Sequence, residues 1–487
     1  PAVDSRRVHT GDELPVEARV ARGERAIAAV VIESGHATSV AGGGCPHQRF
    51  SDITAPLPRA APRHYSVCMT APDAMPGPHS TPDYSATGAG LAPAPAPAAA
   101  PDAVRLETAH LVQPGLATIR RRSNTGLVIA AVIGFIVLAL VMLFVLAYLF
   151  AGLGAAGVII GGLMALVPLG IVFWGIRWID RWEPEPRGAL VFAFLWGAGV
   201  SVLIALIVDA EIQSVIAAAG LGEFGADFFG AAIQAPIVEE LGKGLGVLLL
   251  FFAVRRHFDG PVDGIVYSAW VAGGFAFTEN ILYFGSELVA GGAPVEVFFI
   301  RGIMSPFAHV MFTAFIGAAI GYAAQRPGWF RGVVAFLLGS IPAILLHAFW
   351  NGALCFVSDF YGYYLLVQVP MFIVAVWLVS LLRQQERRVT FERLTEYAAV
   401  GWFHTDEVAM LSSPAGRRTA MSWARTHGLG APMKAFIRDA TRLAYARQRI
   451  VGDRDMIGAQ ADEAELLARV AASRHALHGA VATGPTG

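Results

Sequence analysis

The sequence predicts an all-α fold, a polytopic bundle of about eight transmembrane helices with a disordered N-terminal tail and a small helical cytoplasmic C-terminal segment. Hydrophobic residues make up 55% of the 487 residues and charged residues only 15%, and the mean hydropathy is +0.55. These values are typical of membrane proteins and not of soluble enzymes. Apolar runs of about 20 residues also recur, which is the length that crosses a bilayer as a helix. Basic residues gather in alternate loops between these runs.

Residues 1–125 differ in composition from the rest of the chain. They are rich in Ala, Pro, Gly and Ser, contain the run APAPAPAAAP, and show no sustained helical or strand period. Such a segment has too little apolar surface to form a core, so we expect it to be disordered. It contains no basic region followed by a short apolar run and a small-residue cleavage site, so we expect no cleaved signal peptide.

The membrane-spanning domain is expected at residues 126–383. At a rise of 1.5 Å per residue, about 20 residues cross a hydrocarbon core of about 30 Å. Eight runs of roughly this length are present, and the last is the shortest. They lie at residues 127–150, 155–178, 189–208, 228–253, 266–288, 302–324, 333–356 and 365–382.

The charges of the loops predict the orientation of the bundle. Basic residues mark cytoplasmic loops, and here they fall on alternate sides of the runs, at positions 120–122, 177–187, 255–256, 326–331 and 383–388. The other loops carry mainly acidic residues, and Arg301 is the only basic residue near one of their ends. We therefore expect an integral, multi-pass protein of the cytoplasmic membrane with both termini in the cytoplasm.

The fourth run places three ionisable residues inside an apolar helix. Glu239 and Glu240 are adjacent, and Lys243 follows one turn later. Residues three and four positions apart share a helix face, so Lys243 can partly neutralise both carboxylates. Charges within a bilayer are costly, face a bundle interior or a wet cavity, and mark function. Pro236 has no N–H to donate to the carbonyl of Ala232, so a kink is expected just before the glutamates.

Four predicted helices carry a Glu or a His at a similar depth. Each residue lies 15 to 17 positions from the nearest charge at the cytoplasmic end of its helix, and the four are Glu240, Glu279, His309 and His347. At helical rise this is about 24 Å, in the outer half of the membrane. A buried ion pair or a hydrogen bond between helices would account for any one of them. Their shared depth predicts a single site.

Several motifs resemble those of one known family. They are PIVEELGK at 236–243, GFAFTEN at 274–280 and HAFWN at 347–351, together with DRWEPEP at 180–186 and PVDG at 261–264. In this order, and each on its own predicted helix or loop, they resemble the PrsW family of intramembrane proteases, which is related to the CAAX-processing and bacteriocin-processing proteases. The resemblance covers roughly residues 170–355.

The resemblance implies a transmembrane protease domain and its active site. Carried onto this sequence, the implied catalytic residues are Glu239, Glu240, Lys243, Glu279, Asn280, His309, His347 and Asn351. It also implies that the substrate is a single-pass membrane protein of the anti-sigma-factor type, cut outside or near the outer membrane face. The partners are then this substrate and the lipid bilayer.

Two chemistries for peptide hydrolysis remain open. In the first, Glu239 or Glu240 removes a proton from water, a second acid or a His protonates the leaving amine, and His, Asn or Lys stabilises the oxyanion. In the second, a divalent metal such as zinc makes the water nucleophilic. The candidate ligands for that metal are Glu240, Glu279, His309 and His347. The chain has no HExxH motif, and its three cysteines are too scattered for a closed zinc site.

Other functions fit the sequence less well. A proton- or cation-coupled transporter or channel could use the same buried Glu, His and Lys residues. However, the last four runs do not repeat the first four, and broken helices do not occur at matched positions, as they usually do in secondary transporters. The formal net charge of −1 argues against nucleic acid as a partner.

The remaining segments are expected to be structural. Residues 384–487 mix charged residues with apolar residues at helical spacing, which predicts a small cytoplasmic helical segment. The DRWEPEP loop is expected to be a rigid connector, because Pro restricts the residue that precedes it. Asp259 lies at a predicted membrane edge and is expected to be solvated.

Overall fold

The computed structural model describes residues 125–482 except 221 and 455. All regular elements in this part of the chain are helices, which confirms the predicted all-α class. The predicted disordered tail lies outside the described residues, apart from its last position.

The first two predicted runs are the two arms of α3 (Thr125–Ile179). Gly154 separates them, with φ 65° and ψ 175°, a conformation that helical residues do not adopt and that glycine reaches without a steric penalty. A straight helix of 55 residues would be about 80 Å long, far more than a bilayer requires. The break at Gly154 therefore lets one helical segment supply two shorter ones.

Several of the following helices contain a π-helical segment. In chain order the elements are α4 (Arg187–Leu195), η3 (Trp196–Ser201), α5 (Val202–Ala219), α6 (Glu223–Phe229), η4 (Gly230–Gln234), α7 (Ala235–Ala253), η5 (Arg255–His257), α8 (Pro261–Ala290), α9 (Pro294–Val297), η6 (Phe298–Met304), α10 (Ala308–Ala324), α11 (Phe330–Ala353), α12 (Phe360–Tyr363), η7 (Tyr364–Gln368) and α13 (Val369–Ala399). Of these, η3, η4, η6 and η7 are π-helical and η5 is a 3₁₀ turn. Single π turns are frequent at functional sites.

Five helical stretches in the described chain are long and apolar enough to cross a membrane. They are residues 128–179, 187–216, 294–324, 330–353 and 360–399. The helices α7 and α8 are not among them. Helix α7 carries Glu239, Glu240 and Lys243 within 19 residues, and α8 contains many small and polar residues along its length. The predicted number of about eight crossings therefore stays a prediction.

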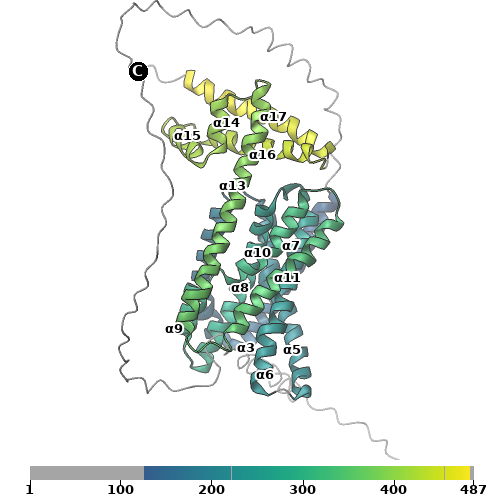
Figure 1. Ribbon diagram of the computed structural model, residues 1–487, viewed down its shortest axis with the longest axis vertical. Coiled ribbons are helices and arrows are strands. Elements are labelled where there is room, and N and C mark those ends of the chain that lie inside the picture. Colours follow the sequence, from purple (N-terminus) through teal and green to yellow (C-terminus); the bar gives the residue numbers. More distant parts are fainter. Residues whose placement is uncertain (1–124, 221, 455, 483–487) are drawn as a thin grey trace, which may run out of the picture. The chain divides into compact units, whose positions relative to one another are not determined.

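Helix α8 lies at the centre of the bundle and contacts α3, α4, α7 and α10 (Figure 1). Helix α8 has glycine residues at the positions where the backbones of neighbouring helices come close. A Cβ atom on Gly264 would lie 1.9 Å from the carbonyl oxygen of Gly317 in α10, and one on Gly274 would lie 2.2 Å from that of Phe194 in α4. Such close approach is the usual way in which membrane helices pack.

The loops at Arg255 and Arg326 lie against each other, since Arg255 Nη2 donates to the Arg326 carbonyl over 3.2 Å. The DRWEPEP loop is also held in place. Trp182 Nε1 donates to Thr390 Oγ1 over 3.0 Å, and the Tyr267 hydroxyl donates to Glu185 Oε2 over 2.5 Å. Glu185 is only 7% exposed, and this burial raises the pKa of its carboxyl well above its usual range.

The segment after the bundle is helical, as predicted. Helix α13 runs through the predicted domain boundary at 383/384 without a break, and α14 (Thr405–Ser412), α15 (Pro414–Thr426), α16 (Gly430–Val451) and α17 (Met456–Ala482) follow. These helices have their own core, which includes Leu394, Leu411, Leu443 and Val470.

The expectation that Asp259 is solvated is wrong. Its side chain is buried, at 6% exposure, and Arg449 and Arg454 lie 3.1 and 3.5 Å from its oxygens. Both arginines come from the C-terminal segment about 190 residues later in the chain, so the local sequence gave no sign of them.

Candidate active site

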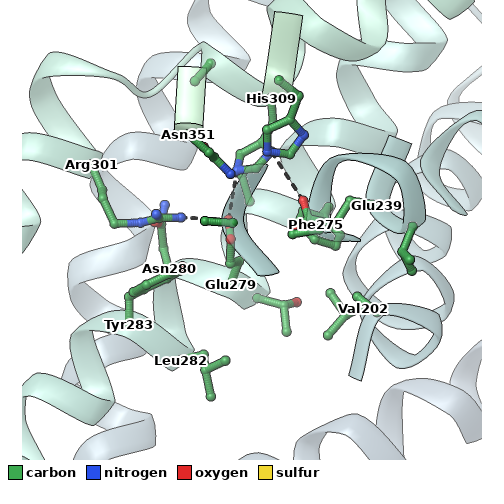
Figure 2. A pocket seen from close by; sticks show the side chains of 18 of the residues that line it. Val202, Glu239, Phe275, Glu279, Asn280, Leu282, Tyr283, Arg301, His309 and Asn351 are labelled. Atoms are coloured by element: carbon green, nitrogen blue, oxygen red, sulfur yellow. Dashed lines mark hydrogen bonds and ion pairs between the residues drawn. The ribbon is translucent and has the colours of Figure 1, made fainter. Parts of the chain in front are cut away.

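The eight predicted site residues lie on four neighbouring helices. Helix α7 carries Glu239, Glu240 and Lys243, α8 carries Glu279 and Asn280, α10 carries His309, and α11 carries His347 and Asn351. The structure brings their side chains together at one site, and six of the eight line its cavity (Figure 2).

Lys243 links the two glutamates to α10. Its ammonium lies 3.0 Å from Glu239 Oε2, 2.9 Å from Glu240 Oε1 and 3.0 Å from His309 Nδ1. The side chain is fully buried, and its ammonium also lies over the ring of Phe275, 3.9 Å from the ring centre. A charge without solvent needs such partners, because an unpaired buried ion is strongly unfavourable.

Glu240 is the inaccessible member of the glutamate pair. Its side chain is 0% exposed. Its Oε1 atom accepts a hydrogen bond from Lys243 Nζ and lies 3.1 Å from His347 Nδ1. Its Oε2 atom accepts a hydrogen bond from Thr313 Oγ1 over 2.8 Å. Thr313 was not predicted as a site residue. It lies four residues after His309 in a helix of otherwise apolar character, and that spacing was the available signal.

Glu279 fixes the orientation of the His309 ring. Its Oε2 atom lies 2.8 Å from His309 Nε2. Lys243 can only donate hydrogen bonds, so Nδ1 of His309 carries the lone pair and Nε2–H faces the carboxylate. This arrangement, in which a carboxylate holds the far nitrogen of an imidazole, commonly sets the tautomer of functional histidines.

Arg301 is a second residue that the sequence analysis did not include in the site. Its Nη2 donates to Glu279 Oε2 over 2.7 Å, and its Nε donates to Asn280 Oδ1 over 3.2 Å. The guanidinium also lies 3.7 Å from the ring centre of Tyr283. Its position as the only basic residue near an acidic loop was a signal that could have identified it.

The cavity has a volume of about 210 Å³. Of the predicted residues, its walls include Glu239, Glu279, Asn280, His309, His347 and Asn351, and Arg301 also lines it (Figure 2). Glu240 and Lys243 are not part of the wall. Glu239 keeps 11% of its side chain exposed, so it is the member of the pair that a molecule in the cavity can reach.

A metal ion would find four ligands here. One atom from each of Glu239, Glu240, His309 and His347 lies within 4.8 Å of all the others. Three of these residues belong to the predicted metal set. Glu239 takes the fourth place, and Glu279 lies instead at the far nitrogen of His309. Two imidazoles and two carboxylates form a donor set that suits zinc, and the ammonium of Lys243 at the same oxygens shows that this group attracts a cation.

A bundle of apolar helices that encloses carboxylates, imidazoles and amides around one cavity holds the groups that hydrolysis within a membrane requires. Comparison with known proteins agrees. Residues 185–377 match the family described as "PrsW family intramembrane metalloprotease".

Similar proteins carry the same name. The chain is 30% identical over 220 residues to "Protease PrsW" of Clostridioides difficile (strain 630). The matched region covers 45% of this chain and 87% of that protein. It is 31% identical over 214 residues to "Protease PrsW" of Geobacillus kaustophilus (strain HTA426). That match covers 43% of this chain and 84% of that protein. No solved structure matches the chain.

The chain belongs to the PrsW family and is an intramembrane protease. It is therefore an integral, multi-pass membrane protein. This membership favours a protease over the transporter or channel that the buried charges would also allow.

Proposed function

We propose that this chain hydrolyses a peptide bond in a single-pass membrane protein, and that Glu239 is its general base. The observation that carries the proposal is that the cavity reaches one of the two glutamates and not the other. Glu239 lines the cavity, whereas Glu240 is fully buried among Lys243, Thr313 and His347. A general base must reach the water that it deprotonates.

The residues of the cavity account for each proton and charge of the reaction. Glu239 accepts a proton from a water molecule, and the hydroxide attacks the carbonyl carbon of the substrate. The C–N bond then breaks, and the same proton passes to the leaving amine. The Asn351 amide lines the cavity and donates to the oxyanion. Lys243 and Arg301 pair with the surrounding carboxylates through the contacts described above.

The donor set also supports a divalent metal such as zinc as a cofactor. Glu239, Glu240, His309 and His347 would hold it, and a bound metal would polarise the carbonyl and acidify water. In that chemistry Glu239 would be a ligand and not the general base. Glu279 would then orient His309 from its other nitrogen, because that contact leaves Nδ1 to face the ion.

The substrate, the orientation and the domain roles belong to the same proposal. The family resemblance supports an anti-sigma-factor-like substrate, and the loop charges support cytoplasmic termini with cleavage in the outer half of the bilayer. We assign residues 126–383 to the protease domain and residues 384–487 to a cytoplasmic helical segment.

Substitution of Glu239 by Gln tests the proposed base. Glu239→Gln keeps the shape of the side chain but removes the basic oxygen, so we expect cleavage of a single-pass substrate to fall by about 10³-fold or more. The measurement is the cleavage rate of purified protein in liposomes. Glu296→Gln is the control, because Glu296 is an exposed residue of α9 outside the cavity. A wild-type rate for Glu239→Gln in folded protein would exclude this residue as the base.

A further inference from the structure

The active-site cavity extends beyond the catalytic groups to a polar pair at its other end. Gln234, the last residue of η4, and Asp209 of α5 both line the cavity. Gln234 Nε2 donates to Asp209 Oδ1 over 3.1 Å. No reaction step described above uses either residue, so their presence in the wall requires another explanation.

Gln234 presents a buried acceptor that has no partner. The residue is only 5% exposed, and within the described chain its Oε1 atom has no hydrogen-bond partner. The direction of the amide is fixed by chemistry. A carboxylate accepts but does not donate, so the NH₂ group must face Asp209 and the carbonyl oxygen must face away from it. Buried polar atoms are nearly always satisfied, so an orphaned one on a residue of the cavity wall is a candidate contact for a molecule in the cavity.

The chemical class of that ligand follows from the reaction. A peptide bond inside a transmembrane helix is sheltered by the helix, so the substrate must be extended near the cut before water can reach it. Extension frees backbone N–H groups, and a bilayer offers them no acceptor. An enzyme that holds such a segment gains from an acceptor in its wall.

The position of Gln234 suits this task. It precedes Glu239 by five residues, about 7.5 Å along the helix. An extended chain advances about 3.3 Å per residue, so a substrate with its cleaved bond at Glu239 would pass Gln234 about two residues away from the cut. The π-helical turn at Gly230–Gln234 lies directly before α7 and ends at this residue.

We propose that Gln234 is a substrate-binding residue whose Oε1 atom accepts a hydrogen bond from a backbone N–H of the extended substrate, about two residues from the cleaved bond. Asp209 is the positioning residue that fixes the direction of the amide. The ligand is a peptide backbone and not a particular side chain. This inference rests on the proposed proteolytic function.

An ester scan of a substrate tests the contact directly. The probe is a synthetic peptide with one apolar span of about 20 residues, selected from a set of such peptides because the wild-type protein cleaves it in liposomes. Single amides within three positions on either side of the cut are replaced by esters, which removes one N–H at a time. The values of kcat and KM are measured for the wild type and for Gln234→Met, which has similar length and no acceptor. Gln368→Met is the control, because Gln368 is a buried residue of the π-helical η7 that does not line the cavity.

We expect one ester position, about two residues from the cut, to lower kcat/KM of the wild type roughly tenfold, mainly through KM. Gln234→Met should show a similar loss with the all-amide peptide and no further loss with that ester, whereas Gln368→Met should keep the wild-type response. A merely structural role for Gln234 would lower the rate for all peptides and leave the ester effect intact.

Equal ester effects in the wild type and in Gln234→Met would overturn the inference. So would a wild type that responds to no ester, and this second measurement does not depend on the folding of the variant. If the wild-type protein cleaved no single-span peptide, the proposed proteolytic function would fail first. If the peptide is cleaved but no ester effect depends on Gln234, only the proposed role of Gln234 is rejected, and the proteolytic function stands.

Discussion

Lys243 illustrates how single residues hold this site together. Its ammonium has no contact with solvent and instead lies within 3.0 Å of two carboxylates and one imidazole. Removing one partner from a buried ion pair costs about 3–5 kcal/mol, because the other charge stays buried. Changes at Lys243 or Glu240 therefore affect folding and chemistry together. Glu239, which keeps 11% of its side chain exposed in the cavity wall, is a better probe of mechanism.

His347 separates the two chemistries. If it is a metal ligand, His347→Ala should lose activity together with bound metal, and chelation of the wild type should reproduce this loss. If it acts on the oxyanion, His347→Gln should retain partial activity, reduced on the order of 10² to 10³ in rate, and chelators should have no effect. Metal analysis of the purified wild type and of both variants, alongside their cleavage rates, makes the distinction.

Full activity in His347→Ala would remove this residue from the site. The stacking of its ring on Phe312, with centres 4.7 Å apart, would then be its main role. Thermal unfolding of the same variants shows whether a loss of activity comes from a loss of fold.

At the level of whole helices, the site depends on the close approach of α8 and α10. These helices carry Glu279 and His309, whose contact is 2.8 Å long. Gly264 and Gly317 allow the approach from both sides, since a Cβ atom on either would lie about 2 Å from a carbonyl oxygen of the other helix. The distance between α8 and α10, which the two glycines set, therefore also controls the contact between Glu279 and His309 further along the same two helices.

Gly264→Ala should weaken both packing and catalysis. The added methyl group would meet the Gly317 carbonyl oxygen at 1.9 Å, and overpacking of this kind costs about 1–3 kcal/mol. We expect a lower midpoint of thermal unfolding and a reduced cleavage rate. Gly170→Ala in α3 is the matched control, because a Cβ atom there meets nothing within 4 Å. Equal effects of the two substitutions would show that the contact between α8 and α10 does not control the site.

For the whole molecule, contacts at one end of the bundle join parts of the chain that are far apart in sequence. Arg449 and Arg454 reach Asp259, Arg417 Nη1 donates to the Trp182 carbonyl over 3.2 Å, and Trp182 donates to Thr390. The C-terminal segment thus packs on the loops that carry the basic residues. The predicted topology places this end in the cytoplasm and the catalytic layer in the outer half of the membrane.

Cysteine labelling tests this topology. In a background without the three native cysteines, Ala293→Cys in the loop before α9 should react with a membrane-impermeant reagent in intact cells. Thr405→Cys in the C-terminal segment should react only after the membrane is broken. Both positions are exposed. The reverse pattern would invert the orientation and move the catalytic layer to the inner half of the bilayer.

The sequence by itself determined the class of the fold, and it predicted where the chemistry lies. Apolar runs specify helices that cross a bilayer, and helical geometry alone puts Lys243 on the same face as Glu239 and Glu240. Counting from the loop charges also predicted one depth for Glu279, His309 and His347. These inferences depend only on the rise and period of a helix, which are the same in every sequence.

Only the tertiary structure decided how the helices face one another. It buried Glu240 and left Glu239 in the cavity wall, although the two are adjacent. It brought Thr313, Arg301 and Gln234 to the site from neighbouring segments, and it paired Asp259 with arginines almost 200 positions away. The rotation of each helix about its axis is set by packing against its neighbours, where glycines and bulky side chains must fit. No local pattern in the sequence encodes that rotation.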